Sequence, residues 1–395
     1  MERIWNSSTM LRTSHSIKLM TSKHKQSNNT PLKRRVFVAM SGGVDSAVSA
    51  ALLKKAGYDV TGVFIKVWQP DFLPCSWRDE RRDAMKVALA LDIPFLFFDF
   101  EDEYKRDVVD KVIAEYKAGR TPNPDVLCNK EIKFGAFWEK AKKSGADFIA
   151  TGHYAQIYEV RSKEYEMREG KDKEKDQSYF LWTLTQHDLS HTLFPIGNLQ
   201  KSEVRKLARQ YHLPVSDKKD SQGICFIGDI RMDEFLSHFV SAKPGNVLNT
   251  RGDIIGTHRG APFYTVGERH GFKVIKKQSK DGAFYVLSKD IGANTITVSN
   301  QEPEILSLSP IRIMIKNVNW INKPVTNVLS ARIRYRGEKM PVSIVQHRVL
   351  NNLIVEFKEP ARGLSLGQSL VFYDNGSAKS GANICLGGGV MDKIL

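Results

Sequence analysis

The sequence predicts an α/β fold, in which a doubly wound parallel sheet is followed by a small linking domain and a C-terminal β-barrel. From residue 36 to about 151, short apolar runs alternate with amphipathic segments. From about 245 onward, short and often alternating stretches are separated by Gly, Pro and Asn. The first pattern is typical of buried parallel strands joined by helices, and the second of small barrels and sandwiches. With 395 residues, the chain is long enough for two or three such domains.

The individual elements follow from the period of the apolar residues. Continuous apolar runs predict strands at 36–40, 60–65, 95–100 and 148–151. Amphipathic segments predict helices near 46–56, 78–91, 102–117 and 131–144, and a further helix at 201–211. The remaining segments predict an ordered loop at 118–130, a solvated hairpin or loop at 161–176, and a loop at 217–229. Ligands of such sheets bind at the carboxyl ends of the strands.

The composition, 41% hydrophobic and 26% charged, is ordinary for a globular protein, and the absence of a long uncharged apolar run argues against a membrane protein. The net charge of +15 is unevenly spread, with +7 in residues 1–35, −1 in 36–244 and +9 in 245–395. A basic C-terminal part is what a surface that meets a phosphate backbone requires. A solvated basic face explains the same excess.

The first 30 or so residues have the composition of a targeting peptide. They are rich in Ser and Thr, Glu2 is their one acid, and their basic residues include Arg3, Arg12 and Lys18. Such a leader is typical of a mitochondrial presequence, and the alternative is a disordered basic tail.

The string SGGVDS, residues 41–46, follows the first expected strand and opens the first helix. Glycines let backbone N–H groups approach an anion closely, and the helix adds the positive end of its dipole. The Gly-Lys-Ser/Thr of a Walker A loop and the third Gly of a dinucleotide fingerprint are both missing. The string therefore indicates a phosphate-binding turn of a different kind.

Two of the four cysteines lie in contexts that favour chemistry. Cys128 follows Asp125 by three residues in a Pro-rich segment, and Cys225 is flanked by glycines. Two thiols on separate loops indicate sulfur transfer by thiol–disulfide exchange, although a buried structural Cys is the alternative for each. Cys75 and Cys385 have no such neighbours, and without a CxxC pair a structural zinc site is not expected.

Together, these strings resemble the tRNA-specific 2-thiouridylase family, a branch of the PP-loop ATP pyrophosphatases. The resemblance runs from about residue 35 to the C-terminus. It is carried by VFVAMSGGVDS, AGRTPNPDVLCNKEIKFG, ATGHYA, KDQSYFLW, LFPIG, KDSQGICFIG, YTVGERHG, RIRYRG, GQSLVFY and CLGGG. With the leader, the sequence is similar to the mitochondrial member of the family. The segment LSLG before Gln368 departs from the Thr-Pro-Gly common in the family, which puts the local turn in doubt.

The resemblance implies roles for individual residues. Cys128 and Cys225 are the implied catalytic thiols, with the persulfide on Cys225, and Asp125 is an implied acid or base. The implied ATP contacts are Ala39, Met40, Ser41, Gly42, Gly43, Val44, Asp45, Ser46, Ile65 and Gly152. The implied tRNA contacts are Asn123, Pro124, Asp125, His153, Lys175, Asp176, Gln177, Arg334, Tyr335 and Gln368. From its neighbours alone, His153 fits positioning better than acid–base work, and Arg332, Arg334, Tyr335 and Arg336 are expected on one C-terminal strand.

The resemblance also implies the reaction, its cofactors and its partners. ATP, with Mg²⁺, adenylylates the C2 oxygen of a wobble uridine in tRNA, and persulfide sulfur then displaces AMP to give 2-thiouridine. The implied partners are tRNA and a protein that donates or relays persulfide sulfur. No membrane is expected, and we expect a monomer. We expect a leader at 1–34, a PP-loop catalytic domain at 35–235, a mostly-β domain at 236–304 and a tRNA-binding barrel at 305–395.

Two other functions fit part of these observations. An amidotransferase-type synthetase of the same superfamily uses ammonia and needs no cysteine pair. A non-catalytic RNA-binding protein that kept the fold would not release pyrophosphate from ATP.

Overall fold

The computed structural model describes residues 33–73, 77–219, 230–241, 243–275, 282–348, 352–374 and 383–395. Most of the expected leader, Cys75 and Cys225 lie outside these residues. The chain divides into two compact units. Unit 1 comprises Met1–Glu101, Ile132–Ser221 and Gly376–Cys385, and unit 2 comprises Asp102–Glu131, Gln222–Asn375 and Leu386–Leu395. No helix within the described ranges is long and apolar enough to cross a membrane.

Unit 1 is built on a parallel sheet whose strand order is β3-β2-β1-β4-β7. Its strands are β1 (Arg35–Ala39), β2 (Asp59–Lys66), β3 (Phe95–Asp99), β4 (Phe148–Ala150) and β7 (Thr192–Leu193). β1 pairs with β2 on one side and with β4 on the other, so the winding reverses at β1. Such a switch point is where open α/β sheets bind ligands, and both SGGVDS and TGHYA follow the strands that border it.

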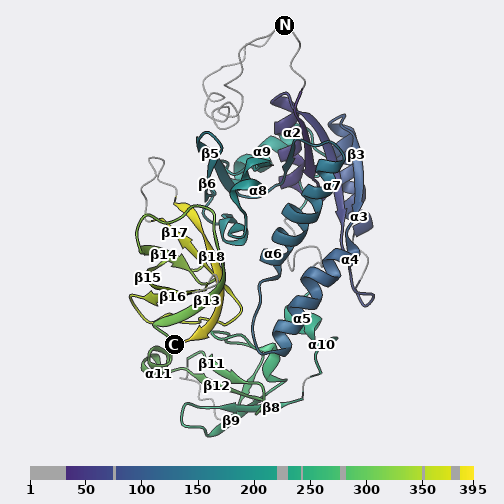
Figure 1. Ribbon diagram of the computed structural model, residues 1–395. Helices are drawn as coiled ribbons and strands as arrows, with labels where there is room; N and C mark the ends of the chain where they lie inside the picture. Colours follow the sequence, from purple (N-terminus) through teal and green to yellow (C-terminus); the bar gives the residue numbers. More distant parts are fainter. Residues whose placement is uncertain are drawn as a thin grey trace. The chain divides into compact units, whose positions relative to one another are not determined.

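Helices and a hairpin surround this sheet. The helices are α2 (Val44–Lys55), α3 (Trp77–Ala90), α7 (Phe137–Lys143), α8 (Gln186–Ser190), α9 (Lys201–Gln210) and the 3₁₀ helix η3 (Ser178–Leu181). The hairpin strands are β5 (Ala155–Arg161) and β6 (Glu164–Glu169). Helix α2 packs against β1 and β2, and α9 packs against α2 (Figure 1). The side chains of Val36, Val38, Ala47 and Val48 are fully buried between them, so α2 packs closely on the sheet.

Unit 2 begins with the helices that follow β3 in the chain. α4 (Glu101–Tyr104) starts at the last residue of the first segment of unit 1 and continues as the π-helix η1 (Lys105–Val109) and α5 (Asp110–Lys117). α6 (Pro124–Leu127) leads into the π-helix η2 (Cys128–Ala136). A small sheet follows α10 (Met232–Ser237), in the order β10-β9-β8-β12-β11. Its elements are β8 (Gly245–Leu248), β9 (Ile254–His258), η4 (Ala261–Phe263), β10 (Lys273–Val274), β11 (Tyr285–Asp290) and β12 (Thr295–Ser299).

After α11 (Glu302–Ser307), six strands close into an antiparallel barrel. They are β13 (Arg312–Trp320), β14 (Val328–Arg332), β15 (Met340–Arg348), β16 (Asn352–Phe357), β17 (Ser369–Tyr373) and β18 (Ile384–Ile394). The order is β13-β16-β15-β14-β17-β18, and pairing of β13 with β18 closes the ring. The first two residues of β18 pair with β6 and are counted in unit 1. The predicted fold class is confirmed.

Two expectations about elements need correction. The segment 118–130 is a loop only up to Asn123, because Asn123 caps α6 and Pro124 opens it. β14 ends at Arg332, so Arg334, Tyr335 and Arg336 lie in the turn that follows. Arg336 has φ +57° there, which a strand does not allow.

Candidate active site

The turn between β1 and α2 has the geometry of an anion-binding loop. Gly43 precedes α2 in an extended conformation and carries no side chain to cap the first helical turn. Gly42 has φ +72°, and a Cβ there would overlap the backbone carbonyl of Glu80. The Ser46 hydroxyl ties the turn together, since Oγ accepts from Ser41 N at 3.3 Å and donates to the Gly43 carbonyl at 3.2 Å. An uncapped helix start behind glycines is suited to phosphate.

Gly152 lies directly beside this turn. A Cβ at Gly152 would be 2.8 Å from Ser46 N and 2.9 Å from the carbonyl carbon of Asp45, so no side chain fits there. Met40 continues the β1 ladder through a 2.8 Å bond to the Val63 carbonyl, and the Ile65 side chain in β2 is buried. We call residues 39–46, together with Ile65 and Gly152, the nucleotide cradle.

The Asp45 carboxylate has two partners that the sequence analysis missed. Lys201 Nζ lies 2.8 and 2.9 Å from its two oxygens, and the Tyr154 hydroxyl donates to Oδ1 at 2.7 Å. Tyr154 belongs to the TGHYA string, and Lys201 is the first residue of the expected helix at 201–211. The sequence therefore placed both residues in recognisable segments, but nothing in it indicated that their side chains meet at Asp45.

His153 is a buried, neutral side chain. Its Nδ1 lies 2.6 Å from Thr151 Oγ1, and its ring packs against Phe134 and Phe194. Burial, reinforced by the nearby Lys133 ammonium, holds the pKa of His153 well below its usual range. A neutral buried imidazole can position neighbouring groups, and its contact with tRNA stays a prediction.

Asp176 and Gln177 stabilise the segment that carries Tyr154. Gln177 Oε1 accepts from Tyr154 N at 3.0 Å, and Gln177 N donates to the Tyr154 carbonyl at 2.9 Å. Asp176 is buried, with Oδ1 accepting from the backbone N–H groups of Gly170 and Ser178. Lys175 is partly exposed beside them. These contacts give Asp176 and Gln177 a structural function, and the tRNA contacts expected of all three residues stay predictions.

In unit 2, Asp125 and Cys128 lie one helical turn apart. Asn123 Oδ1 accepts from Val126 N at 3.2 Å and caps α6, which leaves the amide nitrogen of Asn123 as a donor. Residues three apart share a helix face, so Asp125 and Cys128 lie on the same side. Asp125 is partly exposed, whereas Cys128 is fully buried at the start of a π-helix. Such distortions are frequent at functional sites.

Gln368 supports the backbone just before Asn123. Its Nε2 donates to the carbonyls of Thr121 and Pro122, both at 3.0 Å. Thr121 N donates to the Leu366 carbonyl at 2.8 Å. Gly367 has φ +92°, and a Cβ there would lie 2.9 Å from Thr121 N. The turn made by LSLG is therefore intact and packs closely on the segment that leads to Asp125.

The turn after β14 presents the predicted RNA-binding side chains of unit 2. Arg334 is exposed and lines a cavity of about 450 Å³, which also includes Gly267 and Gly363. The Arg336 guanidinium lies 5.2 Å from the centre of the Tyr335 ring. A guanidinium beside an aromatic face provides both a phosphate contact and a stacking surface.

Comparison with protein-family models divides the chain into three matched segments. Residues 34–229 match the tRNA methyl transferase HUP domain, 233–300 the tRNA methyl transferase PRC-barrel domain, and 311–391 the aminomethyltransferase beta-barrel domain. Among solved structures, a U34-tRNA thiolase from Methanococcus maripaludis aligns with a TM-score of 0.33 and 18% identity. That alignment covers 51% of this chain and 63% of the thiolase.

Relatives in sequence match over almost their whole length. The tRNA-specific 2-thiouridylase MnmA of Nitrosomonas europaea is 45% identical over 367 residues, which cover 91% of this chain and 98% of the relative. An enzyme of the same name from Listeria innocua is 42% identical over 372 residues, covering 93% of this chain and 96% of the relative. This identity extends across both units, and the chain therefore belongs to the tRNA-specific 2-thiouridylase family.

Proposed function

We propose that this chain is a tRNA 2-thiouridylase, which activates the C2 oxygen of a wobble uridine with ATP and replaces it with sulfur. The observation that carries the proposal is the full-length similarity to enzymes of that name, in a chain that has both the nucleotide cradle and the Asp125–Cys128 helical turn. Neither an amidotransferase nor an RNA-binding protein without activity needs this combination.

In the first step, the uridine C2 oxygen attacks the α-phosphorus of ATP. The bond between the α-phosphorus and the bridging oxygen breaks, and pyrophosphate leaves with the electron pair. Asp125 accepts the proton from uridine N3, so that C2 and N3 become doubly bonded. The turn at 41–43 and the start of α2 hold the phosphates, because their backbone N–H groups and the helix dipole favour negative charge.

The cradle also fits a magnesium ion. The Asp45 carboxylate is an oxygen ligand of the kind that Mg²⁺ prefers, and its side chain is 32% exposed. Within the described ranges, no cluster of three or more His, Cys, Asp and Glu side chains could hold a metal ion. We propose that phosphates and water supply most of the ligands of the ion. When bound, Mg²⁺ would neutralise charge on the phosphates.

In the second step, the terminal sulfur of a Cys225 persulfide attacks C2, and AMP leaves. The Cys128 thiolate then attacks the Cys225 sulfur, which forms a Cys128–Cys225 disulfide and releases the sulfur on C2. Uridine N3 regains its proton from Asp125. Each turnover consumes one persulfide, and a thiol reductant restores the two thiols. In the alternative order, Cys128 first releases hydrogen sulfide from the persulfide.

The division of work between the two steps can be tested with Cys225→Ala. We expect this variant to form AMP and pyrophosphate from ATP in the presence of tRNA, but to produce no 2-thiouridine. Nucleoside mass spectrometry of the tRNA and AMP release measured in parallel give the two readouts. Loss of ATP turnover together with thiolation would show that the thiol takes part in the first step. Full thiolation would show that Cys225 does not carry the transferred sulfur.

We also propose that residues 1–34 direct the protein to mitochondria. The proposal is supported by their five basic residues before position 30, their Ser and Thr content and their one acid. A fusion of these residues to a fluorescent protein should enter mitochondria, and replacing Arg3, Arg12 and Lys18 with Gln should prevent it. A fusion that stays outside mitochondria would contradict the proposal.

A further inference from the structure

The Asp45 carboxylate in the nucleotide cradle is already paired with a cation from its own chain. Lys201 Nζ bridges its two oxygens at 2.8 and 2.9 Å, and the Tyr154 hydroxyl occupies one of them as well. The Lys201 side chain is 13% exposed and that of Asp45 is 32% exposed, so the pair is partly shielded from water. Such an ion pair is stronger than one on an open surface.

The position of this ammonium group is fixed by the elements around it. Lys201 begins α9, and its backbone N–H donates to Asp172 Oδ2 at 2.9 Å. Glu203 caps the same helix by accepting from Gln200 N at 2.6 Å. Tyr154 is almost fully buried, and its ring centre lies 5.9 Å from Lys201 Nζ. The ammonium therefore reaches Asp45 from a rigid helix start.

The ion pair between Lys201 and Asp45 competes with the ligands that the proposed reaction places in the nucleotide cradle. ATP places several negative charges beside the turn at 41–43, next to the Asp45 carboxylate, and a magnesium ion competes with Lys201 for the same carboxylate oxygens. If the magnesium ion binds the Asp45 carboxylate, the Lys201 ammonium loses this partner and lies next to negatively charged phosphate groups.

We propose that Lys201 binds the pyrophosphate leaving group of ATP. Without nucleotide, its ammonium pairs with Asp45, and with nucleotide it contacts the β- and γ-phosphates. When the bond between the α-phosphorus and the bridging oxygen breaks, the electron pair stays on pyrophosphate, and Lys201 stabilises that charge without transferring a proton. This inference rests on the proposed function, because it concerns the same ATP.

A second lysine near the turn is committed to a different role. Lys218 Nζ donates to the Gly42 carbonyl at 3.1 Å and to Asp83 Oδ2 at 2.8 Å. Although burial raises the pKa of the Asp83 carboxyl, hydrogen bonds from Lys218 and Lys86 bring it below its ordinary value. Lys218 thus holds the backbone of the turn in place, whereas the Lys201 ammonium contacts the Asp45 carboxylate and the Tyr154 ring.

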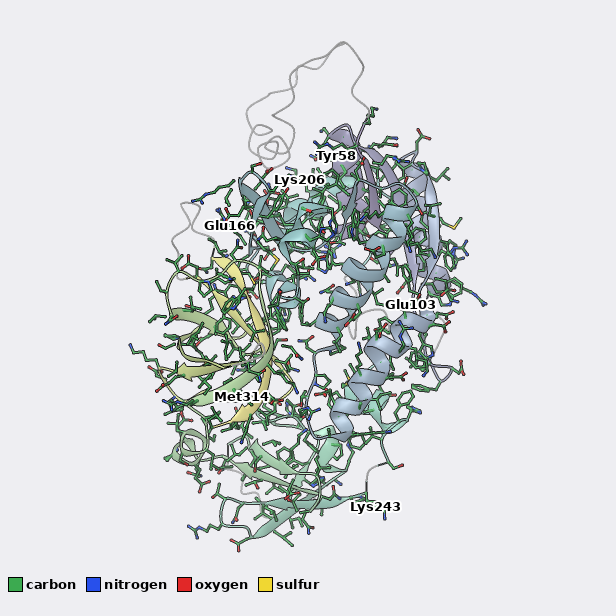
Figure 2. All side chains as sticks on the ribbon, in the orientation of Figure 1. Tyr58, Glu103, Glu166, Lys206, Lys243 and Met314 are labelled. Atoms are coloured by element: carbon green, nitrogen blue, oxygen red, sulfur yellow. The ribbon has the colours of Figure 1, made fainter. Side chains whose placement is uncertain are left out.

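The test compares Lys201→Gln with Lys206→Gln, which changes an exposed lysine on the same helix (labelled in Figure 2). Calorimetry of the full chain measures binding of pyrophosphate, of AMP and of α,β-methylene-ATP, each with Mg²⁺. We expect Lys201→Gln to weaken pyrophosphate and analogue binding by about tenfold or more, and AMP binding by less than about threefold. Lys206→Gln should bind all three like the unmodified chain.

Unchanged or tighter pyrophosphate binding in Lys201→Gln would overturn the inference, because it would mean that Lys201 only blocks Asp45. Lys201→Arg keeps the charge and is the control for a loss of affinity caused by misfolding. It should retain at least part of the pyrophosphate affinity. If Arg loses as much pyrophosphate affinity as Gln while AMP still binds, the charge is not the reason and the inference fails. If the unmodified chain binds neither AMP nor the ATP analogue, the proposed function itself fails.

Discussion

At the scale of single residues, the glycines of the nucleotide cradle are required by space rather than by turn formation alone. The sequence indicated that Gly42 and Gly43 form a phosphate turn, and the structure gives the turn this geometry. Gly152 was predicted from the family resemblance only. Its reason is physical, since the backbone of Asp45 and Ser46 occupies the space that a side chain would need.

Gly152→Ala should therefore weaken nucleotide binding. The added methyl group must displace the backbone at Ser46 N, which is 2.8 Å away, and so shifts the start of α2. We expect about a tenfold weaker affinity for α,β-methylene-ATP and a loss of about 1–3 kcal/mol in unfolding free energy. Gly282→Ala is the matched control, because a Cβ added at Gly282 would have no neighbour within 4 Å. Equal affinities for the two variants would contradict this account.

His191 gives unit 1 a pH dependence of stability. It stacks on Trp138, with ring centres 3.7 Å apart, and burial, with His187 and Lys142 nearby, lowers the pKa of its imidazole from 6.5 to about 3. The unfolded chain binds a proton below pH 6.5 that the folded chain does not bind until about pH 3. The contribution of neutral His191 to the free energy of unfolding is therefore fully present above pH 6.5 and is lost as the pH falls toward 3.

His191→Phe keeps a ring beside Trp138 but cannot be protonated. Its loss of unfolding free energy between pH 7 and pH 5 should be smaller than that of the unmodified chain by about 2 kcal/mol. Urea unfolding at the two pH values measures this difference. The same pH dependence in both proteins would show that His191 is not the responsible group.

At the scale of elements, the strands and helices of the sheet were readable from apolar periodicity, but the helical start at Pro124 was not. The prolines at 122 and 124 predicted a loop, and the second of them occupies the first position of α6 instead. The short strand β7 was also missed, because Thr192 and Leu193 are too few to show a period. Lys201, Tyr154 and Asp45 converge across 156 positions of sequence, which no local pattern encodes.

The contact between Gln368 and the segment before α6 leads to a prediction for catalysis. Gln368→Ala removes two hydrogen bonds to the Thr121 and Pro122 carbonyls, which should loosen the backbone that positions Asn123 and Asp125. Thiolation should fall by about tenfold or more, while unit 1 should bind the ATP analogue as before.

Gln368→Glu should be more harmful than Gln368→Ala, since a carboxylate would face two carbonyl oxygens without a donor. Single-turnover thiolation assays and calorimetry of analogue binding separate the two effects. A variant that thiolates normally would limit Gln368 to the tRNA contact implied by the resemblance.

At the scale of the whole molecule, charge rather than fold predicts an RNA-binding surface. The excess of +9 in residues 245–395 includes the basic turn after β14, where the sequence had placed a strand. Arg334→Ala should weaken tRNA binding by about three- to tenfold at physiological salt. The plot of the logarithm of the binding constant against the logarithm of the salt concentration should become less steep by about one unit. Arg251→Ala, on an exposed turn of the same unit, is the control. An unchanged slope would remove Arg334 from the interface.

The hydrogen bonds from Gln368 to Thr121 and Pro122 also bear on how the protein is made. During translation, the stretch leading to Asp125 leaves the ribosome long before its supporting glutamine is synthesised. A nascent chain can thus complete the parallel sheet before Gln368 supports the backbone that leads to Asp125. Premature termination shortly before codon 368 would remove this glutamine together with β17 and β18, so the barrel could not close either.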